Sequence, residues 1–211
     1  MAYTVFEDNL VDYEQWYEDH KMVFESEVRA IQAQFEKLPE NIHGIEVGLG
    51  TGRFAHALGI REGIEPAEVM AQKAVQRGIE VVKGTAEQLP YADMQFDFVL
   101  FVTICYLDNL KLALREANRV LKRDGSIIIG FLDKEMPVAQ NYLEKKHRST
   151  FYRDASFYTV KRVESLLKET GFSKPEFNQT LFGELDDIVD AQYPKEGFGE
   201  GSFVVVKAIR K

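Results

Sequence analysis

The sequence has only one cysteine, no long apolar run and no excess of positive charge. Cys105 alone can form neither an intrachain disulfide nor a multi-cysteine metal site, which suits a reducing cytoplasm, and we expect no metal. No apolar stretch approaches the roughly 20 residues of a membrane-spanning helix, and the first residues lack the pattern of a signal peptide. The net charge of −8 argues against nucleic acid or an anionic membrane as the main partner. We therefore expect a cytoplasmic protein.

The composition is that of a globular chain. Hydrophobic residues make up 45% and charged residues 28% of the 211 residues, which argues against wholesale disorder. This length suits a single domain with a sizeable core, so we expect one domain over residues 1–211.

The middle of the chain alternates between strand-like and helix-like patterns. The expected strands are 42–47, 60–64, 79–83, 98–104 and 126–132, and the expected helices between them are 53–58, 66–77 and 110–121. Such alternation predicts an α/β fold with a parallel sheet covered by helices. Ligands of such sheets bind outside the carboxyl ends of the strands.

The flanking segments are predicted as follows. A long amphipathic pattern from 11 to 38 predicts a helix that Pro39 ends, with a break near His20. The remaining predictions are helices over 136–152 and 159–170, the second capped by Thr159, and a pair of strands over 174–182 and 203–209.

Three glycines follow the first strand of the alternating region. Gly48, Gly50 and Gly52 have the spacing G-x-G-x-G, and Arg53 follows them. A P-loop needs Lys and Ser/Thr at that point, and a dinucleotide fingerprint needs G-x-G-x-x-G, so neither fits well. A nucleoside cofactor without phosphates remains, and the alternative is a turn that binds nothing.

Polar residues also follow the next strands. Glu65 ends the second expected strand, where a carboxylate can accept hydrogen bonds from both hydroxyls of a ribose. Taken alone, it is better interpreted as a surface residue near a helix N-terminus, but its pairing with the glycine turn favours the ribose site. The segment 84–91 follows the third strand and can read an adenine edge, or it is a solvated turn. Thr103 lies at the carboxyl end of the fourth strand, where a reacting group is expected.

Together, four segments resemble the class I S-adenosylmethionine-dependent methyltransferases, in particular the type 11-like group with small-molecule and ubiquinone-type enzymes. The segments are IEVGLGTGRFA, GIEPAEVMAQKA, KGTAEQLPYADMQFDFVLFV and LREANRVLKRDGSIIIGF. The C-terminal GEGSFVVV also resembles small uncharacterised bacterial members.

The resemblance implies a Rossmann-like, doubly wound sheet of seven strands, six parallel and the last antiparallel. It also implies an N-terminal helical cap (1–39), a cofactor-binding core (40–132) and acceptor-side helices with the final strand pair (133–211). The implied S-adenosylmethionine contacts are Glu46, Gly48, Gly50 and Gly52 for the methionine part, Glu65 with Pro66 for the ribose, Thr85, Ala86 and Glu87 for the adenine, Thr103 beside the sulfur, and Tyr13 and Trp16 in the cap. Many members carry Asp where this chain has Thr85.

The implied reaction is a direct displacement of the methyl group by a small-molecule acceptor, in which positioning supplies much of the catalysis. The sequence indicates no catalytic residue. His20 and His147 are candidate bases or surface histidines, and Cys105 is interpreted as a small hydrophobe. An apolar lid is expected within residues 135–158, from Met136, Tyr142, Phe151, Tyr152, Phe157 and Tyr158. The acidic loop 184–200 is a candidate for the opposite wall. A non-catalytic cofactor-binding protein is the alternative, and a nicotinamide oxidoreductase is disfavoured.

Overall fold

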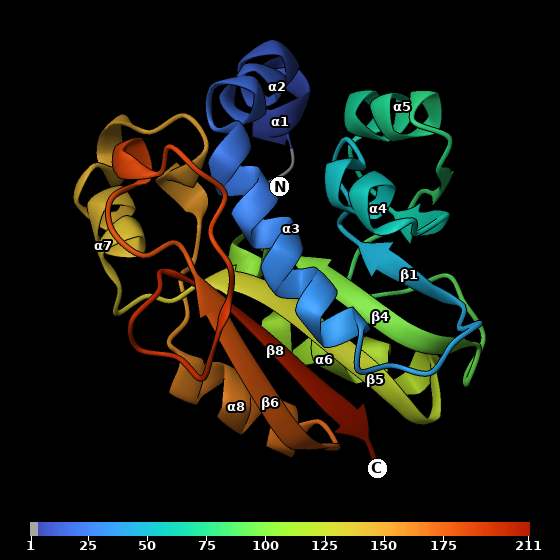
Figure 1. Cartoon of the computed structure of the whole chain (residues 1–211). Helices are drawn as coiled ribbons and strands as arrows, with labels where there is room; N and C mark the ends of the chain where they lie inside the picture. The colour runs from blue at the N-terminus through green and yellow to red at the C-terminus, as the bar shows by residue number, and fades with distance from the viewer. Residues whose placement is uncertain (1–3) are drawn as a thin grey trace.

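A mixed sheet of eight strands forms the centre of the molecule, with helices on both faces (Figure 1). The computed structural model describes residues 4–211. The strands are β1 (Gly44–Val47), β2 (Glu62–Ile64), β3 (Glu80–Val82), β4 (Phe96–Val102), β5 (Leu121–Leu132), β6 (Phe172–Thr180), β7 (Lys195–Glu196) and β8 (Phe203–Arg210). The helices are α1 (Thr4–Asp8), α2 (Leu10–Asp19), α3 (Lys21–Phe35), α4 (Arg53–Leu58), α5 (Glu68–Gln76), α6 (Leu110–Val120), α7 (Pro137–Glu144) and α8 (Val160–Glu169).

The strand order is β3-β2-β1-β4-β5-β8-β6-β7. All pairs from β3 to β5 are parallel, whereas β8 is antiparallel to both β5 and β6. The predicted Rossmann-like sheet with an antiparallel last strand is therefore confirmed. The difference is an eighth strand, the two-residue β7, which pairs with the edge of β6.

The central strand β4 is buried on both faces, which explains its unbroken apolar sequence. Val99 and Phe101 belong to the core beneath α6 and α8, whereas Phe98 and Leu100 belong to the core beneath α3 and α4. Successive side chains of a strand point to opposite faces, so both faces must be apolar here. Figure 1 shows α3 across one face of the sheet and α6 behind the other.

Residues at the helix ends cap the helices, and the sequence shows these residues directly. The Thr159 hydroxyl accepts a hydrogen bond from the Arg162 amide at 3.2 Å, so the predicted N-cap of α8 is confirmed. Asn109 caps α6 in the same way, accepting from the Leu112 amide at 3.0 Å. Gly171 follows α8 with a φ of +90°, a conformation that glycine adopts at little cost.

The predicted N-terminal helix is divided at His20 into α2 and α3. The predicted break is thus confirmed, and α1 precedes these helices as an element that the sequence pattern did not indicate. Residues 1–3 of the predicted cap lie outside the described residues. The Asn178 side chain donates to the Ala30 carbonyl at 2.8 Å, which ties α3 to the sheet.

The predicted helix over 136–152 is wrong in its length. It ends after α7, and two single 3₁₀ turns, Lys146–Arg148 and Tyr152–Asp154, take the place of its second half. The Lys146 ammonium donates to the Ala155 carbonyl at 2.8 Å, a contact across the chain reversal that a continuous helix could not make. Within residues 4–211, no helix is long and apolar enough to cross a membrane.

Candidate functional site

A cavity of about 250 Å³ opens at the carboxyl ends of the central strands. Val47, Val102 and Leu132, the last residues of β1, β4 and β5, line it. The cap helices α1 and α2 and helix α7 contribute Phe6, Tyr13 and other side chains from above. A concave, mostly apolar pocket with a few polar groups is the usual form of a small-molecule site.

The glycine turn forms one side of this cavity. Gly48 has a φ of +72° and Gly50 a φ of +57°, the left-handed region that side chains other than glycine rarely adopt. The Gly48 amide donates to the Ile64 carbonyl at 2.8 Å, which joins the turn to β2. A Cβ added at Gly48 would meet no atom within 4 Å. The turn thus leaves room beside its backbone.

Gly52 lies where α4 packs against α5. A Cβ at Gly52 would lie 2.4 Å from Ile79 Cδ1 and 2.9 Å from Ala74 Cβ. The missing side chain therefore lets α4 pack closely on α5, and Gly52 does not line the cavity.

Glu65 lines the cavity beside the turn and is only 6% exposed. Its carboxyl oxygens accept hydrogen bonds from the Gly50 amide at 2.8 Å and the Ala67 amide at 2.9 Å. Burial raises the pKa of Glu65, and these two amides oppose that rise. A carboxylate can accept about four hydrogen bonds, so roughly half of its acceptor positions stay free for a ligand.

Glu46 lies behind the turn, fully buried, and does not line the cavity. Neither of its carboxyl oxygens has a hydrogen-bond partner in the described part of the chain. Burial raises the pKa of Glu46 well above its usual value, and the charge of Glu65 acts in the same direction. The backbone at Ala55 opposes this rise, so the balance shifts Glu46 toward its neutral form.

Ten of the twelve predicted cofactor contacts line the cavity, and Glu46 and Gly52 do not. The ten are Tyr13, Trp16, Gly48, Gly50, Glu65, Pro66, Thr85, Ala86, Glu87 and Thr103. One oxygen of Glu87 accepts a hydrogen bond from the Asn109 amide at 3.0 Å, so Glu87 also fixes the start of α6. Their contacts with a bound cofactor stay a prediction.

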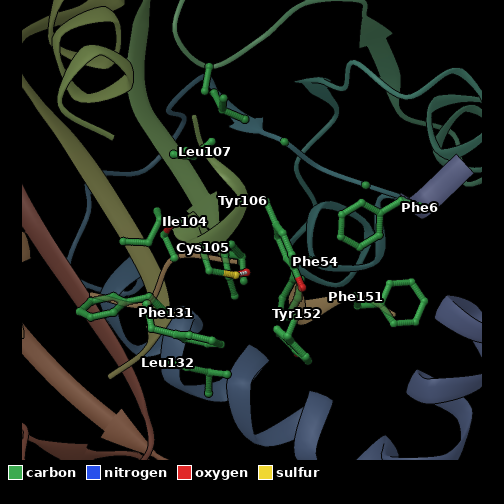
Figure 2. Close-up of a pocket in the computed structure, with 18 of the residues that line it drawn as sticks. Phe6, Phe54, Ile104, Cys105, Tyr106, Leu107, Phe131, Leu132, Phe151 and Tyr152 are labelled. Atoms are coloured by element: carbon green, nitrogen blue, oxygen red, sulfur yellow. Dashed lines mark hydrogen bonds between the residues drawn. The ribbon is translucent and has the colours of Figure 1, made fainter. Parts of the chain in front are cut away.

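Aromatic side chains form much of the remaining wall. Figure 2 shows the rings of Phe6, Tyr106, Phe151 and Tyr152 gathered together. The ring of Phe6 meets that of Tyr106 edge to face at 4.8 Å, and it stacks on Phe151 at 5.6 Å. The predicted apolar lid is thus present in part, since Tyr142, Phe151, Tyr152, Phe157 and Tyr158 line the cavity and Met136 does not.

Both candidate histidine bases lie outside the cavity lining. His20 stacks on Trp16 with ring centroids 4.6 Å apart, and His147 contacts its neighbour Arg148. Cys105 does line the cavity, but burial raises the pKa of its thiol to about 11. It is therefore not an activated nucleophile. Of the predicted acidic wall over 184–200, only Leu185 reaches the cavity.

The N-terminal cap is attached to the glycine turn by an ion-pair network. Glu14 Oε2 of α2 lies 2.8 Å from Arg53 Nη2 and 2.6 Å from Arg77 Nη2. Arg77 Nη1 also donates to the Thr51 carbonyl within the turn at 2.7 Å. Although burial raises the pKa of Glu14, the arginine hydrogen bonds lower it to about 2. The network holds α2, the turn and α5 together.

Two acidic residues of the cavity lining, Glu27 and Asp108, were not among the predicted site residues. Glu27 lies on α3, is 8% exposed and lines the pocket. It occupies the buried helix face four residues after Val23 and four before Ile31. That spacing was the available signal, because a carboxylate at a core position of an amphipathic helix needs an explanation. We call Tyr17, Glu27, Tyr106, Tyr142, Tyr152 and Phe157 the inner chamber.

Comparisons with known proteins point to the methyltransferases. Residues 45–129 match the family model described as "Methyltransferase domain". An uncharacterized protein of Methanocaldococcus jannaschii is 40% identical over 206 residues, which cover 97% of this chain and 98% of that protein. The C-methyltransferase UbiE of ubiquinone and menaquinone biosynthesis from Rhizobium meliloti is 34% identical over 100 residues, 44% of this chain and 39% of that enzyme.

A solved structure matches over the full length. It is a crystal structure from Thermotoga maritima, described as an SAM-dependent methyltransferase and possible histamine N-methyltransferase. The two chains are 40% identical, each is covered completely, and the TM-score is 0.95.

Proposed function

Because this chain belongs to the S-adenosylmethionine-dependent methyltransferases, we propose that it transfers the methyl group to a small molecule held in the inner chamber. The chain is a methyltransferase and its cofactor is S-adenosylmethionine. The Thermotoga structure and the UbiE enzyme are described as methyltransferases, which favours catalysis over a role in binding alone.

The residues around the glycine turn fit this cofactor. Glu65 keeps free acceptor positions for the two ribose hydroxyls, and Gly48 leaves open space where a side chain would stand. Glu46 is a buried carboxyl behind the turn, and neither of its oxygens has a hydrogen-bond partner within residues 4–211. In this proposal, Glu65 and Pro66 hold the ribose, the segment with Thr85, Ala86 and Glu87 holds the adenine, and Thr103 lies toward the sulfur.

The bound cofactor supplies a methyl group on a positively charged sulfur, which is already an activated leaving group. The task of the chain is to orient an acceptor and exclude water, and orientation alone contributes roughly 7–11 kcal/mol. The rings of Phe6, Tyr106 and Phe151 line the cavity with apolar surface and so help to exclude water.

The inner chamber is the observation that supports a small-molecule acceptor. Its side chains come from α2, α3, the turn after β4, α7 and the segment after α7. The rings of Tyr106, Tyr142, Tyr152 and Phe157 stack on one another. Such a chamber suits a compound of a few apolar groups better than a nucleic-acid or protein chain. The description of the Thermotoga relative as a possible histamine N-methyltransferase points the same way.

A labelling experiment tests this proposal. The protein is incubated with methyl-labelled cofactor and an extract separated by ultrafiltration into small molecules and macromolecules. We expect label to move to compounds of the filtrate, and the Glu65→Ala variant to lose this transfer. Label that moves to protein or nucleic acid, with none in the filtrate, would contradict a small-molecule acceptor.

A further inference from the structure

We infer that Glu27 binds the methyl acceptor directly and takes a proton from it, and that the acceptor is an amine attached to an apolar or aromatic body. This inference rests on the proposed function, which it extends by naming the acceptor class and a residue that acts on it.

The position of Glu27 is the first observation. Helix α3 turns its buried face to the sheet with Val23, Ala30 and Ile31, and Glu27 lies on that face where it borders the cavity. Within residues 4–211, no hydrogen bond or ion pair reaches its carboxyl group, although the exposed Glu25 on the same helix pairs with Arg29 at 2.5 Å. A glutamate that is only 8% exposed and lines a cavity, with no partner for its carboxyl group among the described residues, is costly to the protein unless a ligand supplies one.

The groups around Glu27 are aromatic and uncharged. Tyr17 of α2 and Tyr142 of α7 are near enough for the charge of Glu27 to raise the pKa of each phenol. Tyr142 stacks on Tyr152 at 3.9 Å, and Phe157 lies parallel at 6.4 Å. Aromatic faces attract cations, and more strongly where water is excluded. An acidic group among aromatic faces is therefore complementary to a cationic nitrogen and repels an anion.

Protonation supports the same assignment. Burial raises the pKa of Glu27 to about 8. Burial also raises the pKa of Tyr17 well above its usual value and that of Tyr142 to about 12, where Asp186 acts as a further weak cause. Both phenols stay neutral near pH 7, so Glu27 is the group of the inner chamber that titrates there. An ammonium beside it favours the carboxylate, and binding should release a proton.

The chemical step balances. The ammonium form of the acceptor gives one proton to the Glu27 carboxylate, which frees the nitrogen lone pair. The nitrogen then forms a bond to the methyl carbon as the carbon–sulfur bond breaks and its electron pair stays on sulfur. The positive charge thus moves from sulfur to nitrogen, and the proton on Glu27 leaves with solvent after the product departs. A base placed in this way typically contributes 10²–10⁴-fold to the rate.

Binding calorimetry on the full chain tests the inference without turnover. The protein is first saturated with S-adenosylhomocysteine and then titrated with 2-phenylethylamine or its uncharged counterpart 2-phenylethanol. We expect the wild-type protein to bind the amine at least tenfold more tightly. We also expect it to release a proton on binding at pH 7, measured by repeating the titration in buffers of different ionisation enthalpy.

The Glu27→Gln variant should lose the amine preference and the proton release, while its affinity for S-adenosylhomocysteine changes less than twofold. Glu25→Gln, two residues away on the exposed side of the same helix, should behave as wild type. A wild-type protein that binds both probes equally, or neither, overturns the inference, as does proton release that persists in Glu27→Gln.

The inference can fail while the proposed function stands. If the labelled filtrate product carries its new methyl group on oxygen, sulfur or carbon, the acceptor is a small molecule but not an amine. If the label appears on a macromolecule, the proposed function itself is wrong. The position of the methyl group in the product, read by mass spectrometry, separates these outcomes.

Discussion

The backbone amide of Gly50 donates a hydrogen bond to Oε2 of Glu65 at 2.8 Å, although 15 residues separate them. The bond joins the glycine turn after β1 to the residue that follows β2. It orients the carboxylate and at the same time fixes the turn. The two features that the sequence analysis treated as separate signals are thus one structural unit.

Glu65→Ala should weaken the binding of S-adenosylhomocysteine by about 1.5–3 kcal/mol, the contribution of a hydrogen bond to a charged group. Isothermal titration calorimetry measures the change. Glu68→Ala, on the exposed first turn of α5, is the matched control and should bind normally. An unchanged affinity in folded Glu65→Ala protein would remove Glu65 from the site.

Gly48→Ala and Gly59→Ala form a matched pair. Both glycines are exposed with φ near +70°, and an added Cβ meets no atom within 4 Å at either one. Each variant should lose about 1–2 kcal/mol of folding free energy, because an alanine is forced into the left-handed conformation. Only Gly48 lines the cavity, so only Gly48→Ala should weaken the binding of S-adenosylhomocysteine, by about tenfold or more.

Denaturant unfolding and calorimetry on both variants measure these two effects separately. Equal affinities in the two variants would mean that the open space beside Gly48 is not part of the cofactor site.

The Glu14 network should make stability depend on pH at acid values. Hydrogen bonds from Arg53 and Arg77 outweigh burial and bring the pKa of Glu14 to about 2 in the folded chain, against about 4.5 when unfolded. The stabilisation is present above pH 4.5 and is lost as the pH falls toward 2. Glu14→Gln should therefore unfold more easily than wild type by about 1–2 kcal/mol at pH 7, after allowance for solvent screening.

Urea unfolding of wild type and Glu14→Gln between pH 7 and pH 2 provides the measurement. The two free energies of unfolding should converge as the pH falls. Glu25→Gln removes the exposed pair with Arg29 and should change stability little at any pH. A constant gap between Glu14→Gln and wild type would argue against the ion pairs as its cause.

Trp16 should report cofactor binding by fluorescence. It is the single tryptophan of the chain, it lines the cavity, and it stacks on His20. A ligand that enters the cavity changes the polarity around the indole, so we expect its emission to shift or change in intensity as S-adenosylhomocysteine is added. Emission that stays constant while calorimetry records binding would place the ligand away from Trp16.

Local sequence patterns predicted most of the fold. The spacing of apolar residues gave the alternating core from β1 to β5, the break at His20 and the cap at Thr159, because each depends on residues close in the chain. The helix over 136–152 was predicted too long. The chain reverses after α7, and the Lys146 ammonium then reaches the Ala155 carbonyl, a contact that the local sequence pattern does not reveal. The two-residue β7 was missed because its pairing with β6 is set by tertiary contacts.

The residues of the candidate site were likewise predicted only in part. The resemblance to the methyltransferases implied ten residues that line the cavity, together with Glu46 and Gly52, which do not line it. A side chain at Gly52 would meet Ile79 and Ala74, a packing constraint that the spacing does not reveal. Phe6 and Glu27 were not predicted. The core position of Glu27 in its helix was a local signal, but only the tertiary packing shows that this position borders a cavity.

The sequence by itself determined the order of strands and helices and the glycine turn with its carboxylate, because backbone conformation and apolar periodicity are local properties. The tertiary structure alone decided which distant side chains enclose the cavity. It brought Glu27 of α3 beside Tyr142 of α7, more than a hundred positions along the chain. That placement comes from packing the cap and α7 over one end of the sheet, and burial there gives an ordinary glutamate its raised pKa.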